Sequence, residues 1–150
     1  MSRMIRIYLI VLLQLLTASL SSAVYAAEAE TLIKQLPRSY AGEFQWRDSV
    51  RIYKVTLQFT NVRVLDTGVV EATGTGIYDE YGSLSMVNIR AEIDPKDLFL
   101  EIWETDPVAA GRELEGMYRG DLSEDMQTIT AMWRSFTDKN RGYLNLKVKK

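Results

Sequence analysis

Apolar and polar residues alternate along most of the chain, with the period of two that is typical of β-strands with one buried face. The clearest example is the segment 53–60, where Tyr53, Val55, Leu57 and Phe59 alternate with polar residues. Clusters of Asp, Gly, Pro and Ser separate one alternating run from the next, as turns do. The pattern predicts eight short strands, at 40–46, 53–64, 70–78, 87–93, 98–102, 114–118, 129–133 and 144–148.

The connections between these runs decide how the strands are arranged. None is long enough for the crossover helix that parallel strands require, so we expect an antiparallel meander. Eight strands in a meander close most economically into an up-and-down barrel, which removes exposed sheet edges. The fold class is therefore all-β, with a two-sheet sandwich as the alternative. Near Asn61 the alternation changes phase to Val62 and Val64, which predicts a bulge or bend.

Residues ahead of the strands follow other patterns. Leu32, Ile33 and Leu36 lie at helical spacing, so a short helix is predicted over 28–36, ended by Pro37. Before it, residues 1–26 have the layout of a secretory signal peptide: a basic start, a short apolar run and small residues before a cleavage point after Ala26. The expected mature chain, 27–150, is one periplasmic or secreted domain with no membrane span. An uncleaved N-terminal anchor is the alternative.

Composition then limits the chemistry. The 150 residues include no Cys and no His, which excludes disulfides, thiol nucleophiles, imidazole or thiolate zinc sites and His-based acid–base catalysis. Residues 1–26 hold two of the 18 basic residues and none of the 20 acidic ones, so the mature net charge is near −4. This balance disfavours binding to nucleic acid.

A short helix followed by Gly42-Glu43-Phe44 and an eight-stranded meander resembles the calycin superfamily of lipocalins, fatty-acid-binding proteins and avidins. Those families usually carry Trp where Phe44 stands, and they place a basic residue over that ring. Arg141 or Lys147 would take this role here. The segments 116–120 and 128–133 resemble the later hairpins of these families. The resemblance covers residues 28–149 and implies a carrier of small molecules.

Three motifs are weighed as possible chemistry. Asp121, Ser123 and Asp125 have the opening spacing of a calcium loop, but Met126 and Met132 stand where Gly and Glu are needed, so a hairpin turn is expected. Gly74-Thr75-Gly76 lies inside a strand pattern, where glycines kink a strand rather than hold phosphate.

Glu101, Glu104 and Asp106 could form a carboxylate pair of glycosidase type, but a solvated face is favoured. We therefore expect a protein that is not an enzyme and has no metal and no cofactor.

Aromatic residues supply the strongest functional signal. On the face of the strands that is expected to point inward, small residues stand between the aromatic ones. The interior of an eight-stranded barrel is just wide enough to be filled by side chains or to hold one small ligand. The expected function is non-catalytic binding of a small, largely apolar molecule in the lumen. Alternatively, the aromatic residues form a filled core. The alternative function is that of a cell-envelope interaction or inhibitor protein that uses the barrel as a scaffold. The predicted ligand-binding residues are Trp46, Tyr53, Phe59, Tyr78, Tyr118 and Trp133.

The outward phase predicts an apolar patch on consecutive strands, formed by Phe99, Trp103, Met117 and Met132. Soluble monomers seldom leave such a patch bare. The predicted helix 28–36 or a partner protein would cover it.

Overall fold

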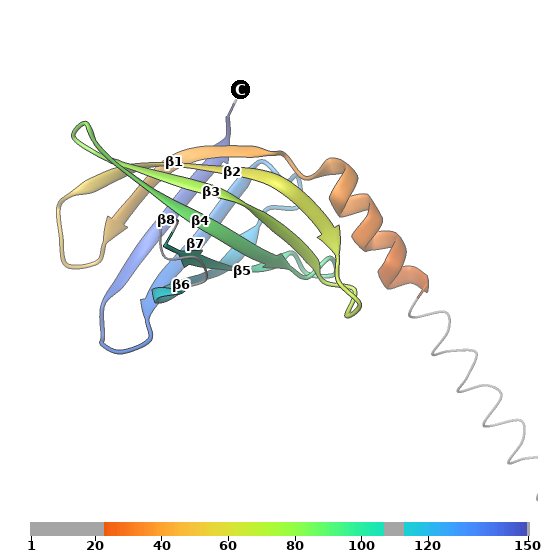
Figure 1. The fold of residues 1–150 in the computed structure, drawn as a ribbon. Coiled ribbons are helices and arrows are strands. Elements are labelled where there is room, and N and C mark those ends of the chain that lie inside the picture. The colour runs from red at the N-terminus through yellow and green to blue at the C-terminus, as the bar shows by residue number, and fades with distance from the viewer. Residues whose placement is uncertain (1–22, 107–112, 150) are drawn as a thin grey trace, which may run out of the picture.

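Eight antiparallel strands form a closed barrel in the computed structural model of the protein, which describes residues 23–106 and 113–149 (Figure 1). Each strand pairs with the next one along the chain, and β8 pairs with β1 to complete the ring. The strands are β1 (Ser39–Trp46), β2 (Ile52–Val64), β3 (Val70–Glu80), β4 (Ser83–Ile93), β5 (Phe99–Thr105), β6 (Glu113–Leu122), β7 (Thr128–Ser135) and β8 (Arg141–Val148).

The closed meander confirms the predicted all-β barrel and excludes the sandwich, because β1 and β8 are neighbours along their whole length. The predicted irregularity near Asn61 is also confirmed: the pairing of β2 with β3 shifts register between Phe59 and Asn61. Close approach of strands occurs at Gly74, where a Cβ atom would overlap the carbonyl oxygen of Gln58. The glycine thus serves the strand packing at this bend.

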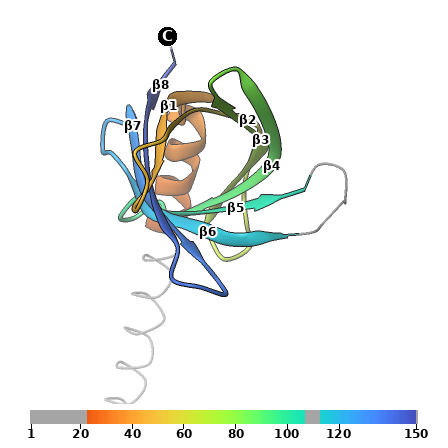
Figure 2. The ribbon, with the colours of Figure 1, turned by 90° about the vertical axis from the view of Figure 1, so that its left-hand side faces the viewer.

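Residues 23–35 form a helix that lies across one end of the barrel and is visible through the ring of strands in Figure 2. The helix starts before the predicted Glu28, since Ala23, Ala26 and Ala27 are strong helix formers with no breaker among them. Cleavage after Ala26 stays a prediction; it would leave most of the helix in place. Within the described residues, no helix combines the length and the apolar character needed to cross a membrane.

The apolar face of this helix packs into the end of the barrel. Ala29, Leu32 and Leu36 are buried in the same cluster as the strand residues. The expectation that the helix covers the outer patch is therefore wrong: its apolar face is buried against the interior of the barrel. We call the end of the barrel that the helix covers the closed end; it holds the turns at 65–69, 94–98 and 123–127.

Side chains fill the half of the barrel next to the helix. Tyr40 is fully buried there, and its hydroxyl donates a hydrogen bond of 2.9 Å to the Met126 carbonyl, which joins β1 to the β6–β7 turn. Phe59 packs edge-on against Tyr40 with ring centroids 6.2 Å apart. Most of the remaining fully buried side chains are branched aliphatic residues: Val55, Leu57, Val70, Ile93, Leu100, Ile102, Ile129, Leu144 and Leu146.

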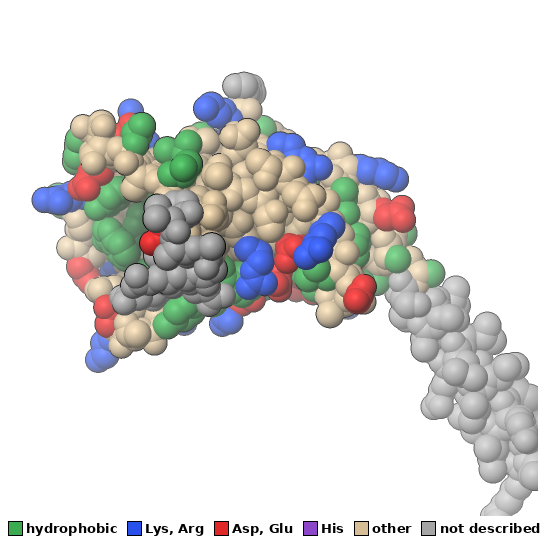
Figure 3. All heavy atoms as spheres, in the orientation of Figure 1, with side chains coloured by type: hydrophobic (Ala, Val, Ile, Leu, Met, Phe, Trp, Pro, Cys, Tyr) green, Lys and Arg blue, Asp and Glu red, His purple; other side chains and the backbone are tan. Residues whose placement is uncertain are grey.

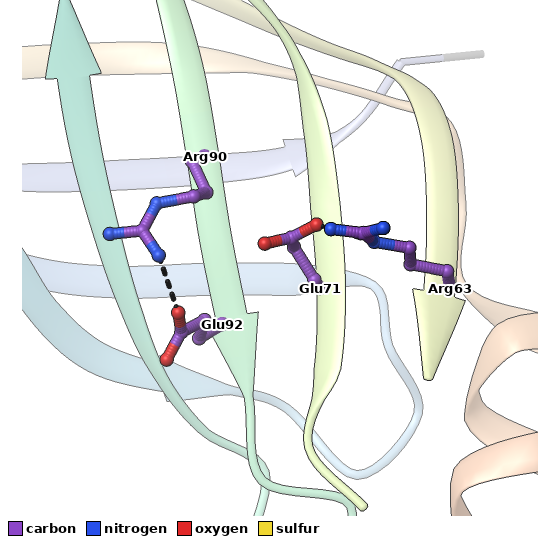
Figure 4. A network of polar contacts seen from close by, with 4 residues as sticks. All are labelled: Arg63, Glu71, Arg90 and Glu92. Carbon is purple, nitrogen blue, oxygen red and sulfur yellow. Dashed lines mark hydrogen bonds and ion pairs between the residues drawn. The ribbon is translucent and has the colours of Figure 1, made fainter. Parts of the chain in front are cut away.

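A band of charge crosses the outer face of the barrel. Glu71, Glu92 and Glu101 stand directly opposite one another on β3, β4 and β5, where like charges would repel. Each glutamate forms an ion pair with an arginine: Arg63 with Glu71 at 2.7 Å, Arg90 with Glu92 at 2.6 Å and Arg119 with Glu101 at 2.7 Å. Figure 4 shows the first two pairs, one between strands and one along β4. The arginines offset the repulsion within the acidic row.

Candidate functional site: a cavity at the open end of the barrel

The barrel is hollow at the end opposite the helix, where the connections 47–51, 81–82 and 136–140 lie. A cavity of about 260 Å³ opens there; we call it the lumen cavity. Seven of the eight strands contribute to its wall: β1, β2, β3, β4, β5, β6 and β7. Its lining residues are Phe44, Trp46, Tyr53, Tyr78, Ser85, Val87, Glu104, Tyr118 and Trp133.

Aromatic rings in edge-to-face contact form most of this wall. Trp46 meets Trp133 with centroids 4.9 Å apart at 87°, and it meets Phe44 at 4.9 Å and 83°. Phe44 also contacts Tyr118 edge-on at 5.9 Å and Tyr53 in a tilted arrangement at 6.1 Å. Such arrangements place the positive edge of one ring against the negative face of the next, so the rings hold one another in fixed orientations.

Two glycines make room for these rings. A Cβ atom at position 116 would overlap the indole of Trp133, and one at position 142 would overlap the ring of Phe44. Both glycines are on the inner face, beside the cavity. The small residues that interrupt the inward phase of the sequence therefore accommodate aromatic side chains here.

A carboxylic acid lies inside the cavity among the rings. Glu104 follows Leu100 and Ile102 on the inner face of β5 and is only 7% exposed. The Tyr78 hydroxyl donates a hydrogen bond to its Oε1 atom, and the Tyr118 hydroxyl lies 2.8 Å from that of Tyr78. The acid and the two phenols form one buried hydrogen-bonded group, the Glu104 cluster.

Burial controls protonation in this cluster. Desolvation raises the pKa of Glu104, while hydrogen bonds from Tyr78 and Tyr118 act in the opposite direction. Burial also raises the pKa of Tyr78 and of Tyr118 well above the ordinary value of a phenol, and the neighbouring carboxylate raises both further. Both phenols therefore keep their protons at neutral pH and act as hydrogen-bond donors.

Five of the six predicted ligand-binding residues come together at the lumen cavity: Trp46, Tyr53, Tyr78, Tyr118 and Trp133. Phe59 does not, because it lies on the inner face but in the filled half of the barrel, beside Tyr40. Trp133 is half-buried in the cavity wall.

Sequence reasoning missed Glu104, which was assigned to a solvated face with Glu101. The alternation Leu100, Ile102, Glu104 was the available signal.

The other motifs weighed from sequence lie outside the cavity. Glu101 is on the outer face, bound to Arg119. The segment 123–127 is a hairpin turn in which Ser123 Oγ donates to Asp125 at 2.6 Å. Across the described ranges, no group of three or more acidic side chains is arranged to hold a metal ion. Arg141 and Lys147 are exposed, and Gly142 lies against the Phe44 ring. The predicted basic side chain over this ring is therefore not observed for either residue.

On the outer face, Trp103 and Met117 stand opposite each other on β5 and β6. Arg90 lies over the Trp103 ring at 4.3 Å, and Met117 is 8% exposed. Phe99, 40% exposed, is separated from them by the Glu101–Arg119 ion pair. Met132 faces Arg119 on the neighbouring strand and is half-buried. Neighbouring side chains thus divide and partly cover the predicted patch; binding of a partner there stays a prediction.

The rim of the open end carries more exposed apolar surface than the patch. Figure 3 shows hydrophobic side chains gathered on the viewer's face at the end of the barrel away from the helix. The exposed hydrophobic residues on the connections and strand ends of this rim are Val50, Ile52, Tyr81, Leu84, Met86 and Phe136. An apolar rim lowers the cost of bringing an apolar molecule to the cavity.

A larger groove of about 450 Å³ runs outside the barrel, between the helix and the turns at the closed end. It is open to solvent and no aromatic side chain lines it, with Leu32, Leu98 and Met126 as its main apolar contacts. It lacks the buried, convergent polar groups that characterise ligand sites. The lumen cavity has such a group among aromatic rings, so it is the candidate functional site.

No protein family model, no curated protein and no solved structure matches this chain.

Proposed function

We propose that this protein binds a small, largely apolar molecule in the lumen cavity, as a non-catalytic carrier of calycin type. The observation that carries the proposal is the division of the barrel interior. Side chains fill the closed half, whereas the open half contains a cavity of about 260 Å³ lined by aromatic rings. A barrel that served only as a scaffold would gain stability by filling this space, because buried voids are costly.

The size of the cavity sets the size of the ligand. An apolar cavity of about 150 Å³ holds one benzene molecule, so the lumen cavity suits a molecule somewhat larger, such as a bicyclic aromatic compound. Burial of the ligand's apolar surface would supply most of the affinity, at roughly 25 cal/mol per Å² removed from water. The hydroxyls of the Glu104 cluster and of Ser85 would fix its orientation.

Calorimetric titration with 2-naphthol, a neutral bicyclic probe, tests the proposal. The wild-type protein should bind one molecule. Ser85→Trp places an indole in the cavity entrance at an exposed position, so it should weaken binding by about tenfold or more. Met86→Trp is the matched control, because Met86 is the next residue on β4, exposed and outside the cavity lining.

Equal binding by both variants would show that the probe sits elsewhere. If the wild-type protein binds neither 2-naphthol nor any other small aromatic probe, the carrier function is overturned and the alternative, an interaction protein that acts through its surface, is favoured.

A further inference from the structure

We infer that the lumen cavity selects an organic cation, an ammonium group attached to a small aromatic or aliphatic body, with Glu104 as its counter-charge. This inference rests on the proposed function and specifies its ligand. Three independent features of the cavity point to a cation: the sign of its charge, the direction of its hydrogen bonds and the nature of its walls.

The only charge that the described lining residues can supply is negative. Glu104 is the sole ionisable carboxyl among the described lining residues, and neither Lys nor Arg is among them. The arginines on the adjacent strands β4 and β6, Arg90 and Arg119, face outward and are held by Glu92 and Glu101. An ammonium group beside Glu104 would supply a positive partner where water is largely excluded, and there an ion pair is stronger than in solvent.

The hydrogen bonds of the Glu104 cluster run toward the carboxylate. Tyr78 gives its one proton to Glu104, and Tyr118 has two acceptors for its own proton, the Tyr78 oxygen at 2.8 Å and the same carboxylate. Both hydroxyl protons are used within the cluster, and what remains for a ligand is lone pairs. A ligand that presents N–H donors matches this arrangement, whereas a carboxylate or a ketone would face acceptors.

The walls suit a positive charge as well. The faces of indole and phenol rings carry negative charge density and attract cations within about 6 Å, and indole attracts them most. Two indoles, Trp46 and Trp133, and the rings of Phe44 and Tyr53 line the same cavity as the Glu104 cluster. An ammonium ion can thus contact aromatic rings and a carboxylate at once.

Calorimetric titration at about pH 7 with three probes that share a phenylethyl body tests the inference: 2-phenylethylammonium (cation), 2-phenylethanol (neutral) and 3-phenylpropionate (anion). We expect the cation to bind about tenfold or more tightly than the neutral probe, since charge-assisted hydrogen bonds are roughly twice as strong as neutral ones. The anion should bind most weakly.

Glu104→Gln should remove the preference for the cation, so that 2-phenylethylammonium and 2-phenylethanol bind this variant with affinities within about twofold of each other; Gln still accepts the Tyr78 hydrogen bond. Glu101→Gln is the matched control on the outer face of β5 and should change neither affinity. Thermal unfolding of each variant verifies its folding.

Equal or tighter binding of the neutral probe by the wild-type protein would overturn the inference and leave the carrier function standing. A cation preference that persists in a folded Glu104→Gln variant would also overturn it. If none of the three probes nor 2-naphthol binds, the carrier function itself fails.

Discussion

Replacing Leu32 by Ala tests whether the helix 23–35 is a structural cap for the barrel. Leu32 is 2% exposed and belongs to the same cluster as the strand residues. The change removes three buried carbon groups at about 0.8 kcal/mol each, and the remaining cavity brings the expected loss of unfolding free energy to about 2–5 kcal/mol. For a domain of this size, a loss of 3 kcal/mol lowers Tm by roughly 10 °C.

Urea unfolding followed by tryptophan fluorescence and by circular dichroism measures this loss. Gln35→Ala is the control, since Gln35 is exposed on the same helix and the change should stay within about 0.5 kcal/mol. Binding of 2-naphthol should be the same in Leu32→Ala as in the wild-type protein, because the lumen cavity opens at the other end. A Leu32→Ala variant as stable as Gln35→Ala would refute the assignment of the helix as a cap.

Two further predictions concern the open end. Because burial raises the pKa of Glu104, the folded state holds this proton more tightly than the unfolded state, and the stability that the proton gives at low pH is lost as pH rises from about 4.5 through the folded pKa. The Tm of Glu104→Gln should therefore rise relative to that of the wild-type protein between about pH 4 and 8, and a Tm difference that is constant with pH would contradict this. Gly142→Ala should lower the unfolding free energy by about 1–3 kcal/mol, because the new methyl group overlaps the Phe44 ring. Arg141 is exposed beside it, so Arg141→Ala should leave the unfolding free energy unchanged; equal urea midpoints of the two variants would show that the Phe44 ring moves aside freely.

Much of the fold was predictable because the side-chain period of a strand is so specific. The alternation of Val55, Leu57 and Phe59 with polar residues indicates which face is inward, and the phase change near Asn61 marks the bulge. The start of the helix was missed because a predicted signal peptide ends in small residues that are also helix formers, so the composition of 23–27 suits both states.

The site was only partly predictable, since alternation gives the face of a residue but not its height along the barrel axis. Phe59 and Tyr53 share one face of β2, yet Tyr53 lies beside Phe44 at the cavity and Phe59 lies beside Tyr40 in the filled half. Which level of a strand meets the cavity depends on its register with the other strands, and alternation does not give that register. Glu104 illustrates a different limit. Surface carboxylates are far more common than buried ones, and this prior outweighed an inward position that the pattern of β5 indicated.

Closure of the barrel has a consequence for how the chain folds. Seven of its eight strand pairings join consecutive strands and need only local hairpins, whereas the pairing of Tyr40 with Val148 joins opposite ends of the sequence. Contacts of such large sequence separation form slowly. Until β1 meets β8, both strands are unpaired edges and the apolar interior is open, and no disulfide holds the ring together. We therefore expect the hazard of edge-to-edge aggregation to fall on the folding chain rather than on the native barrel.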